Sequence, residues 1–481
     1  MFLLAIVSPE VGLAHHLLFG AGGETSVHPA VLVATGLAIV LMFALPRKLV
    51  IAPLLFLSLL SPLGQRFMIG PFHFQIFRAL VAFALIRLIW QMYGAEGGSS
   101  RIKFNAADKA VIYYALACIV CYTLLWQDSS AFFDEVGKAY NVIGFYFVFR
   151  FFIRDRADVE RTIKMLAFAA LPIAAVMLNE QITGRNILSV FGGVPQFSAM
   201  RDGYLRSQGP FSVYLTAGAF GATLLPLFLC LWHRNGSRMV AALGIIAALT
   251  ITITSRTSTA ISACLATLVG IGIWSLRGKM RFVRWSVVLV LVALHLVMKA
   301  PVWALLAKVD IVGGSTGWHR FKIVDNCIRH FWDWCLLGSN NYWTWDGGDD
   351  MWDLANQYVW IAESTGLLSL IFFLRPIVYC FGQVGKARKA AQHNLAQQWF
   401  LWLLGVALFS NLIAFVGIAY CDQTFIPWYA LIAMIIAATS SQPKGVAGST
   451  SANTADQKLL KAEFEAVSKS QPIGVALLGP A

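Results

Sequence analysis

Apolar segments about as long as a membrane span recur along the chain, and short polar stretches separate them. A helix needs about 20 predominantly apolar residues to cross the hydrocarbon core of a bilayer. The pattern predicts about thirteen such helices, and the shortness of several leaves twelve to fourteen open. We therefore expect an all-α, polytopic membrane protein. The predicted spans lie roughly at residues 29–46, 49–64, 74–92, 109–126, 138–153, 163–179, 210–232, 239–254, 257–276, 285–299, 357–382, 398–420 and 424–439.

The composition agrees with this prediction. Of the 481 residues, 58% are apolar and only 13% are charged, whereas about a quarter are charged in soluble proteins. The mean hydropathy is +0.68. These values exclude a soluble globular chain, a disordered chain and a small disulfide-rich secreted chain. The sequence contains no phosphate-binding Gly-Lys-Ser/Thr loop and no dinucleotide fingerprint, so we expect no cofactor.

The distribution of basic residues predicts an orientation. One alternate set of loops carries 19 Lys and Arg, and the other set carries 11. The richer set should face the cytoplasm, which places the C-terminal tail inside. The net charge of +13 is then a consequence of membrane orientation and gives no indication of nucleic-acid binding. The basic loops lie at 47–48, 94–109, 150–164, 233–238, 277–284 and 386–394.

The chain divides into four parts by composition. Residues 1–28 are apolar but lack a basic leading region, and we interpret them as an interfacial segment. Residues 29–199 hold the N-terminal transmembrane helices. Residues 200–440 form a core that includes a long outward-facing loop at about 300–356. Residues 441–481 are rich in Ser, Ala, Gln and Lys and predict a disordered cytoplasmic tail.

The long loop is unusually rich in tryptophan and aspartate. Eight of the 16 Trp fall between residues 303 and 360. Two interpretations are open: an aromatic belt at the membrane interface, or a platform for sugar rings. Four acids in eight residues do not have the spacing of an EF-hand loop, and we predict no metal site. The candidates for sugar binding are Trp318, Trp345 and Trp352, and Asp353 is a candidate general base.

Two arginines lie at the outer boundary of the membrane, where the orientation rule does not predict basic residues. Arg206 directly precedes one span, and Arg256 lies between two spans that almost no loop separates. Outer arginines run against the orientation bias, and a guanidinium binds phosphate through two parallel hydrogen bonds. We interpret both as a pyrophosphate clamp, with snorkelling to lipid headgroups as the alternative.

Cys327 and Cys335 are predicted to face outward, either bridged or as free thiols.

Three stretches of sequence resemble the O-antigen ligase and polysaccharide polymerase superfamily of bacterial inner-membrane proteins. The first runs from Arg206 to Phe211, similar to an Arg-x-x-Gly-x-Phe entrance to a span. The second is Ser255-Arg256 with the small-residue helix that follows. The third runs from Trp318-His319-Arg320 to Asn356-Gln357-Tyr358 and Glu363-Ser364-Thr365-Gly366-Leu367. Together they cover about residues 200–375. The resemblance to inner-membrane proteins implies that the predicted outward loop lies in the periplasm.

The resemblance implies transfer of a glycan from an undecaprenyl-pyrophosphate donor to an acceptor hydroxyl, by a metal-independent inverting glycosyltransferase. Arg206, Arg256 and Arg320 would stabilise the departing pyrophosphate. The candidates for the general base are Asp353, Glu363 and His319. The resemblance also implies binding roles for Asn356 and Tyr358.

One position departs from the family pattern. Many ligases have a histidine directly before the asparagine, and here that residue is Ala355. Ligation to a lipid acceptor and polymerisation of a surface polysaccharide therefore both stay open. Two functions of another class are also open: a lipid-linked oligosaccharide flippase or exporter, and a non-catalytic subunit of an exopolysaccharide assembly complex. The expected partners are the lipid-linked glycan, its acceptor, membrane lipids and other assembly proteins.

Overall fold

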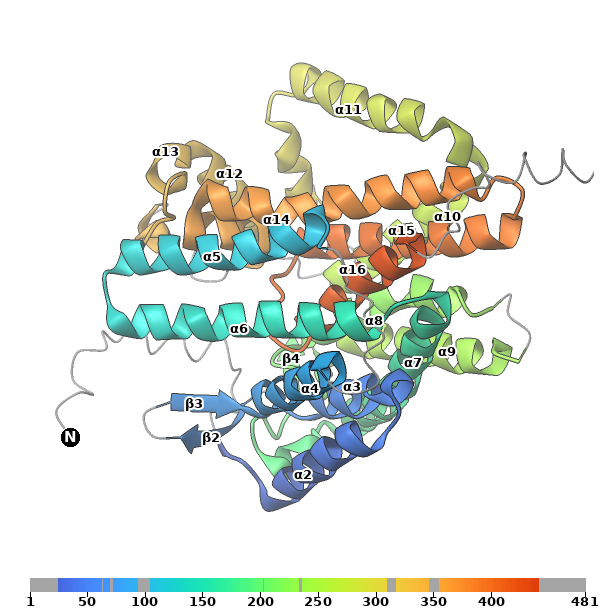
Figure 1. The fold of residues 1–481 in the computed structure, drawn as a ribbon. Coiled ribbons are helices and arrows are strands. Elements are labelled where there is room, and N and C mark those ends of the chain that lie inside the picture. The colour runs from blue at the N-terminus through green and yellow to red at the C-terminus, as the bar shows by residue number, and fades with distance from the viewer. Residues whose placement is uncertain are drawn as a thin grey trace, which may run out of the picture. The chain divides into compact units, whose positions relative to one another are not determined.

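The computed structural model describes residues 25–62, 64–69, 72–93, 104–201, 203–232, 236–308, 317–345 and 354–440 (Figure 1). Within these ranges the chain is mainly helical, and a helix occupies each of the thirteen segments predicted to span the membrane. The predicted tail and most of the predicted N-terminal interfacial segment lie outside the described residues.

The helices follow the apolar segments closely because a backbone in an apolar environment must satisfy its own hydrogen bonds. The α-helices are α2 (Pro29–Ala44), α3 (Ile51–Leu60), α4 (Ile76–Tyr93), α5 (Ala106–Trp126), α6 (Ser129–Phe152), α7 (Arg156–Thr183), α8 (Tyr214–Leu229), α9 (Arg238–Ser255), α10 (Ser258–Gly272), α11 (Met280–Val297), α12 (Gly317–Arg329), α13 (Phe331–Trp334), α14 (Gln357–Ala390), α15 (Leu395–Phe415) and α16 (Phe425–Ser440).

Short 3-10 helices and two small β-sheets complete the described elements. A parallel and an antiparallel pairing join three strands in the order β1-β2-β3, and β4 and β5 form an antiparallel hairpin. The pattern of apolar residues predicts neither sheet. The strands are β1 (Thr25–Ser26), β2 (Gln65–Ile69), β3 (Phe72–Gln75), β4 (Ala199–Arg201) and β5 (Tyr204–Arg206), and the 3-10 helices are η2 (Arg47–Leu49), η3 (Ile187–Phe191), η4 (Ile273–Lys279), η5 (Val302–Lys308) and η6 (Tyr342–Thr344).

Six helical segments among the described residues are long and apolar enough to cross a membrane. Three further apolar helices are shorter: α2, α8 and α16. The chain is thus an all-α membrane protein in its described part, apart from the two small sheets. The six segments are Ala106–Trp126, Arg156–Thr183, Arg238–Ser255, Ser258–Val297, Gln357–Ala390 and Leu395–Phe415.

The helices pack around α16, whose residues are buried from Ile426 to Ala438. A helix that is apolar on every side is stable only inside other helices or lipid. Helix α9 also packs against α7 and α8, α5 against α14, and α10 against α15. By contrast, no residue of α11 is buried, and Figure 1 shows this helix apart from the others.

The predicted long loop is largely folded where the structure describes it. Residues from α12, α13 and the start of α14 form a second apolar core that includes Ile323, Cys327 and Trp334. All eight cysteines lie among the described residues and all are free, so Cys327 and Cys335 are not bridged. Burial raises the pKa of the Cys327 thiol, which makes it a poor nucleophile.

A break in α14 locks this folded loop onto the helix bundle. Gly366 has φ 79° and ψ 176°, a conformation that essentially only glycine adopts. The break frees the Glu363 carbonyl, which accepts a hydrogen bond of 2.7 Å from the Ser339 amide. The Leu367 amide in turn donates to the Cys335 carbonyl at 3.0 Å.

Replacing Gly366 with alanine should therefore destabilise the protein by about 3 kcal/mol or more. A Cβ atom at this position would lie 2.5 Å from the Leu336 carbonyl oxygen, which is backbone and cannot rotate away. The control is Gly385→Ala in the same helix, where no atom lies within 4 Å of the added Cβ. Thermal unfolding in detergent measures the stability of both variants. Equal stability for the two would contradict a structural role for the break in α14 at Gly366.

Candidate functional site

The turn between α9 and α10 is the centre of the candidate site. Arg256 ends α9 in the left-handed conformation, with φ 46° and ψ 51°. It is one of two non-glycine residues with positive φ in the described part of the chain. An arginine in this conformation costs about 1–2 kcal/mol, and such strain is concentrated at functional sites. The next residue, Thr257, caps the N-terminus of α10.

The β4–β5 hairpin places Arg206 beside this turn. The Ser207 amide donates a hydrogen bond of 3.1 Å to the Thr254 carbonyl at the end of α9. The guanidinium carbon of Arg256 lies 4.4 Å from the centre of the Tyr204 ring, and that of Arg206 lies 5.1 Å from the Tyr214 ring. Arg206 is buried, and its Nε has no hydrogen-bond partner among the described residues.

Helix α12 brings the third arginine to the same turn. The buried Arg320 donates from Nη2 to the Thr259 hydroxyl oxygen at 2.9 Å, two residues into α10. Thr259 donates in turn to the Gly417 carbonyl at 3.2 Å. The three predicted arginines come from three separate segments of the sequence, and each of these segments forms or contacts the α9–α10 turn or the helix ends beside it.

The start of α14 closes the site through the segment 416–424. Asn356 caps α14 with its side-chain oxygen and donates to the Val416 carbonyl at 3.3 Å. The Tyr420 amide donates to the Gln357 side-chain oxygen at 2.6 Å. The N-terminal ends of both α10 and α14 therefore lie near the arginines.

These features give the site a positive electrostatic character. Neither Arg206 nor Arg256 forms an ion pair with an acidic residue in the described ranges. Helix N-termini add partial positive charge. A buried, unpaired guanidinium is costly unless it meets an anion. The arrangement is suited to binding a phosphate or pyrophosphate group.

The other predicted residues are placed less closely around the turn. His319 precedes Arg320 on α12 and is half-buried. Glu363 is 2% exposed and lies beside Cys327, about two helical turns along α12 from Arg320. The Tyr358 hydroxyl donates to the Leu412 carbonyl at 3.0 Å, so it supports the α14–α15 contact.

The described tryptophans are peripheral to the three arginines. Trp318 is 61% exposed and lies against Phe321, which leaves much of its ring open. Trp345 stacks on His330 with ring centres 4.5 Å apart and planes within 6°. Asp353 and Trp352 lie outside the described residues.

Sequence reasoning missed two buried acids that position the site. Glu180, near the end of α7, accepts hydrogen bonds from the Gly209 amide at 2.8 Å and the Gln208 amide at 3.2 Å. It is fully buried and so fixes the segment that directly follows Arg206. Its signal was an acid at the very end of an apolar segment, which is a functional hypothesis by default.

Asp422 is the second missed acid, in a polar run between two apolar helices. Its carboxylate accepts hydrogen bonds from the Ser212 amide at 3.1 Å and the Thr424 amide at 3.0 Å, and also from the Thr216 hydroxyl. Burial raises the pKa of this carboxyl above its usual range. Beside it, the Gln423 side chain donates to the Pro210 carbonyl at 2.9 Å. Both residues hold the segment between Arg206 and α8 in place.

The chain matches no protein-family model and no curated protein sequence.

Proposed function

We propose that the chain is a membrane glycosyltransferase. It moves a glycan from an undecaprenyl-pyrophosphate donor to an acceptor hydroxyl at the periplasmic face of the bacterial inner membrane. The observation that carries the proposal is the placement of Arg206, Arg256 and Arg320 around the turn between α9 and α10. A scaffold or carrier has no evident need for three arginines at one point.

The chemistry of the transfer explains why arginines are needed. An acceptor oxygen attacks the anomeric carbon, the bond from that carbon to the phosphate oxygen breaks, and the pyrophosphate leaves with additional negative charge. Preorganised cations stabilise charge that develops in the transition state more than charge already present in the substrate. Because Arg206 and Arg256 have no acidic partner in the described residues, their full charge is available to the leaving group.

The acceptor hydroxyl must lose its proton during the attack. Of the two candidate bases that the structure describes, Glu363 is enclosed in the core between α12 and α14. His319 is adjacent to Arg320 in sequence and half-buried, which favours His319 as the base. The exposed face of Trp318 beside it offers a surface for a sugar ring.

The decisive experiment is transfer in vitro with the purified full-length protein and a defined undecaprenyl-pyrophosphate oligosaccharide. Two acceptors are supplied separately: a second lipid-linked glycan and a lipid A core. Elongated glycan identifies a polymerase, and glycosylated lipid A core identifies a ligase. Translocation of the lipid-linked glycan across vesicles without a new glycosidic bond would overturn the proposal in favour of a flippase. Absence of both activities would favour a non-catalytic subunit.

A further inference from the structure

The N-terminal end of α7 holds a second basic site, far from the arginines of the candidate active site. A recess of about 280 Å³ opens there between η2 and the first turns of α7. Its volume is sufficient for a phosphate group with its substituents. The residues that line it are Lys48, Ala157, Glu160, Arg161 and Lys164.

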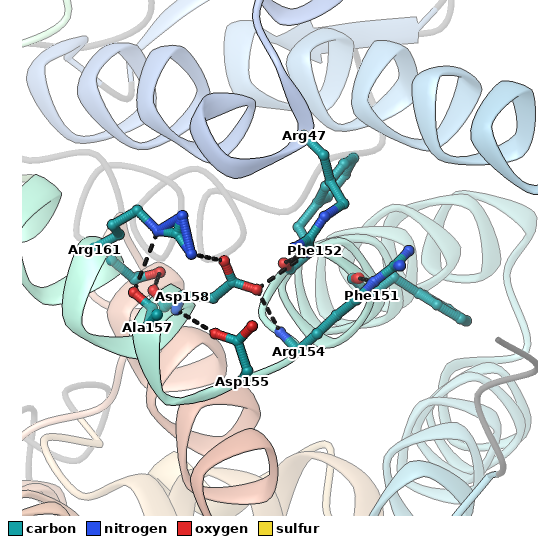
Figure 2. Close-up of polar contacts among 9 residues, drawn as sticks. Arg47, Phe151, Phe152, Arg154, Asp155, Ala157, Asp158 and Arg161 are labelled. Carbon is teal, nitrogen blue, oxygen red and sulfur yellow. Dashed lines mark hydrogen bonds and ion pairs between the residues drawn. The ribbon is translucent and has the colours of Figure 1, made fainter. Parts of the chain in front are cut away.

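Buried acids organise this end of α7 and neutralise only part of its positive charge. Figure 2 shows Asp158 between Arg47 and Arg161; Arg47 donates to it from Nη1 at 3.1 Å, and Arg161 also donates to it. The Arg154 amide donates to the same carboxylate at 3.1 Å. Asp158 is 4% exposed, and its charge is paired internally with Arg47 and Arg161.

The recess itself keeps an excess of positive charge. Its lining has three basic residues and one acid, a balance of 3 − 1 = +2. That acid, Glu160, is 5% exposed and accepts from Arg156 Nε at 3.1 Å. Lys48 and Lys164 form no ion pair within the part of the chain that the structure describes. Two amines and part of a guanidinium are thus available to an anion.

The location of the recess selects the kind of anion. Residues 160 and 180 of α7 are 20 positions apart, which is about 30 Å along a helix and equals the thickness of the hydrocarbon core. The recess and Glu180 therefore lie at opposite membrane boundaries. The exposed apolar side chains of Leu49 and Phe168 flank the recess, one residue from Lys48 and one turn from Lys164. A ligand there meets cations at headgroup level and apolar surface just below.

We propose that this recess binds the headgroup phosphate of an anionic phospholipid, with its acyl chains along the exposed side of α7. Lys48 and Lys164 hold the phosphate, and Arg161, fixed by Asp158, adds a directional donor. Basic recesses beside membrane helices are suited to anionic lipids in this way. A free phosphate would use the same cations but gains nothing from Leu49 and Phe168. The site is independent of the proposed glycan transfer.

The test measures lipid binding to the full-length protein in phosphatidylcholine nanodiscs with increasing phosphatidylglycerol. Native mass spectrometry counts the retained lipid, and thermal unfolding reports stabilisation. Replacing both lysines, Lys48→Gln with Lys164→Gln, should weaken phosphatidylglycerol binding about 30-fold, since each cation near the surface contributes about a factor of five. The matched control removes two exposed lysines from the end of α14, Lys386→Gln with Lys389→Gln, and should bind as the wild type does.

Three outcomes would overturn the proposal. Equal losses for the two double variants would show a general surface-charge effect. Retention of phosphatidylcholine as strong as that of phosphatidylglycerol would exclude a charge-selective site. If inorganic phosphate stabilises the protein as much as phosphatidylglycerol does, the ligand of the recess is a soluble anion and not a lipid.

Discussion

Replacing Arg256 with glycine should lower the rate of glycan transfer by about 100- to 1,000-fold while leaving the protein folded. The guanidinium is lost, and with it one of the cations that we propose stabilise the leaving pyrophosphate. The backbone at this position has φ 46°, which glycine adopts without a steric penalty. We therefore expect the free energy of unfolding to change by no more than about 1 kcal/mol.

The chain offers a close control for this variant. Gln127 also ends a helix, α5, in the left-handed conformation, with φ 50°. Gln127→Gly makes the same backbone change away from the site, so it should alter stability similarly and leave transfer unchanged. Initial rates with the defined lipid-linked oligosaccharide measure both. If the transfer rate of Arg256→Gly equals that of Gln127→Gly, Arg256 does not contribute to the transfer reaction.

Arg206 provides a second variant on the same reasoning. Arg206→Lys keeps the positive charge but loses the paired hydrogen bonds that a guanidinium forms with phosphate. Its transfer rate should lie between those of the wild type and Arg206→Ala. If lysine restores the full rate, charge alone is sufficient at this position and the clamp needs no bidentate contact.

The helices were predictable because length and apolarity alone decide where a chain can cross a bilayer. A helix lies in each of the thirteen predicted segments, and six helical segments of the described residues are long and apolar enough to cross a membrane. The sequence alone did not predict which distant segments contact each other. Arg206 and Arg320 were recognised by residue type and resemblance, whereas their meeting at the α9–α10 turn depends on the Ser207–Thr254 and Arg320–Thr259 hydrogen bonds.

The missed residues share a physical reason. Glu180 and Asp422 each accept a hydrogen bond from a backbone amide more than 25 residues away in sequence, and the residues around them do not reveal that partner. The small β4–β5 hairpin was missed because its strands are only three residues long. Some of the tryptophans of the long loop, among them Trp334, contribute to a separate folded core, which neither interpretation of their function predicts.

Replacing Glu180 with alanine should lower the transfer rate by about 10- to 100-fold, although Glu180 does not contact the turn itself. Its two carboxylate oxygens accept hydrogen bonds from the Gln208 and Gly209 amides, shortly after Arg206 in the chain, and from the Ser198 hydroxyl, before the hairpin that carries Arg206. Without them the buried donors lose their acceptor, and a shift of about 1 Å in a positioned group can cost a factor of 100 in rate. The loss should fall on kcat, with KM for the acceptor unchanged, because the proposed role of Arg206 is to stabilise the leaving group.

The conservative variant and a second glutamate separate positioning from folding. Glu180→Gln keeps one acceptor oxygen and should recover part of the rate lost in Glu180→Ala. Glu160→Gln alters a buried glutamate at the other end of the same helix, where it pairs with Arg156, and should reduce stability without lowering kcat. If kcat per folded molecule falls equally in the Glu160 and Glu180 variants, Glu180 serves only the stability of α7. If kcat falls only in the Glu180 variants, Glu180 has the expected role of positioning Arg206.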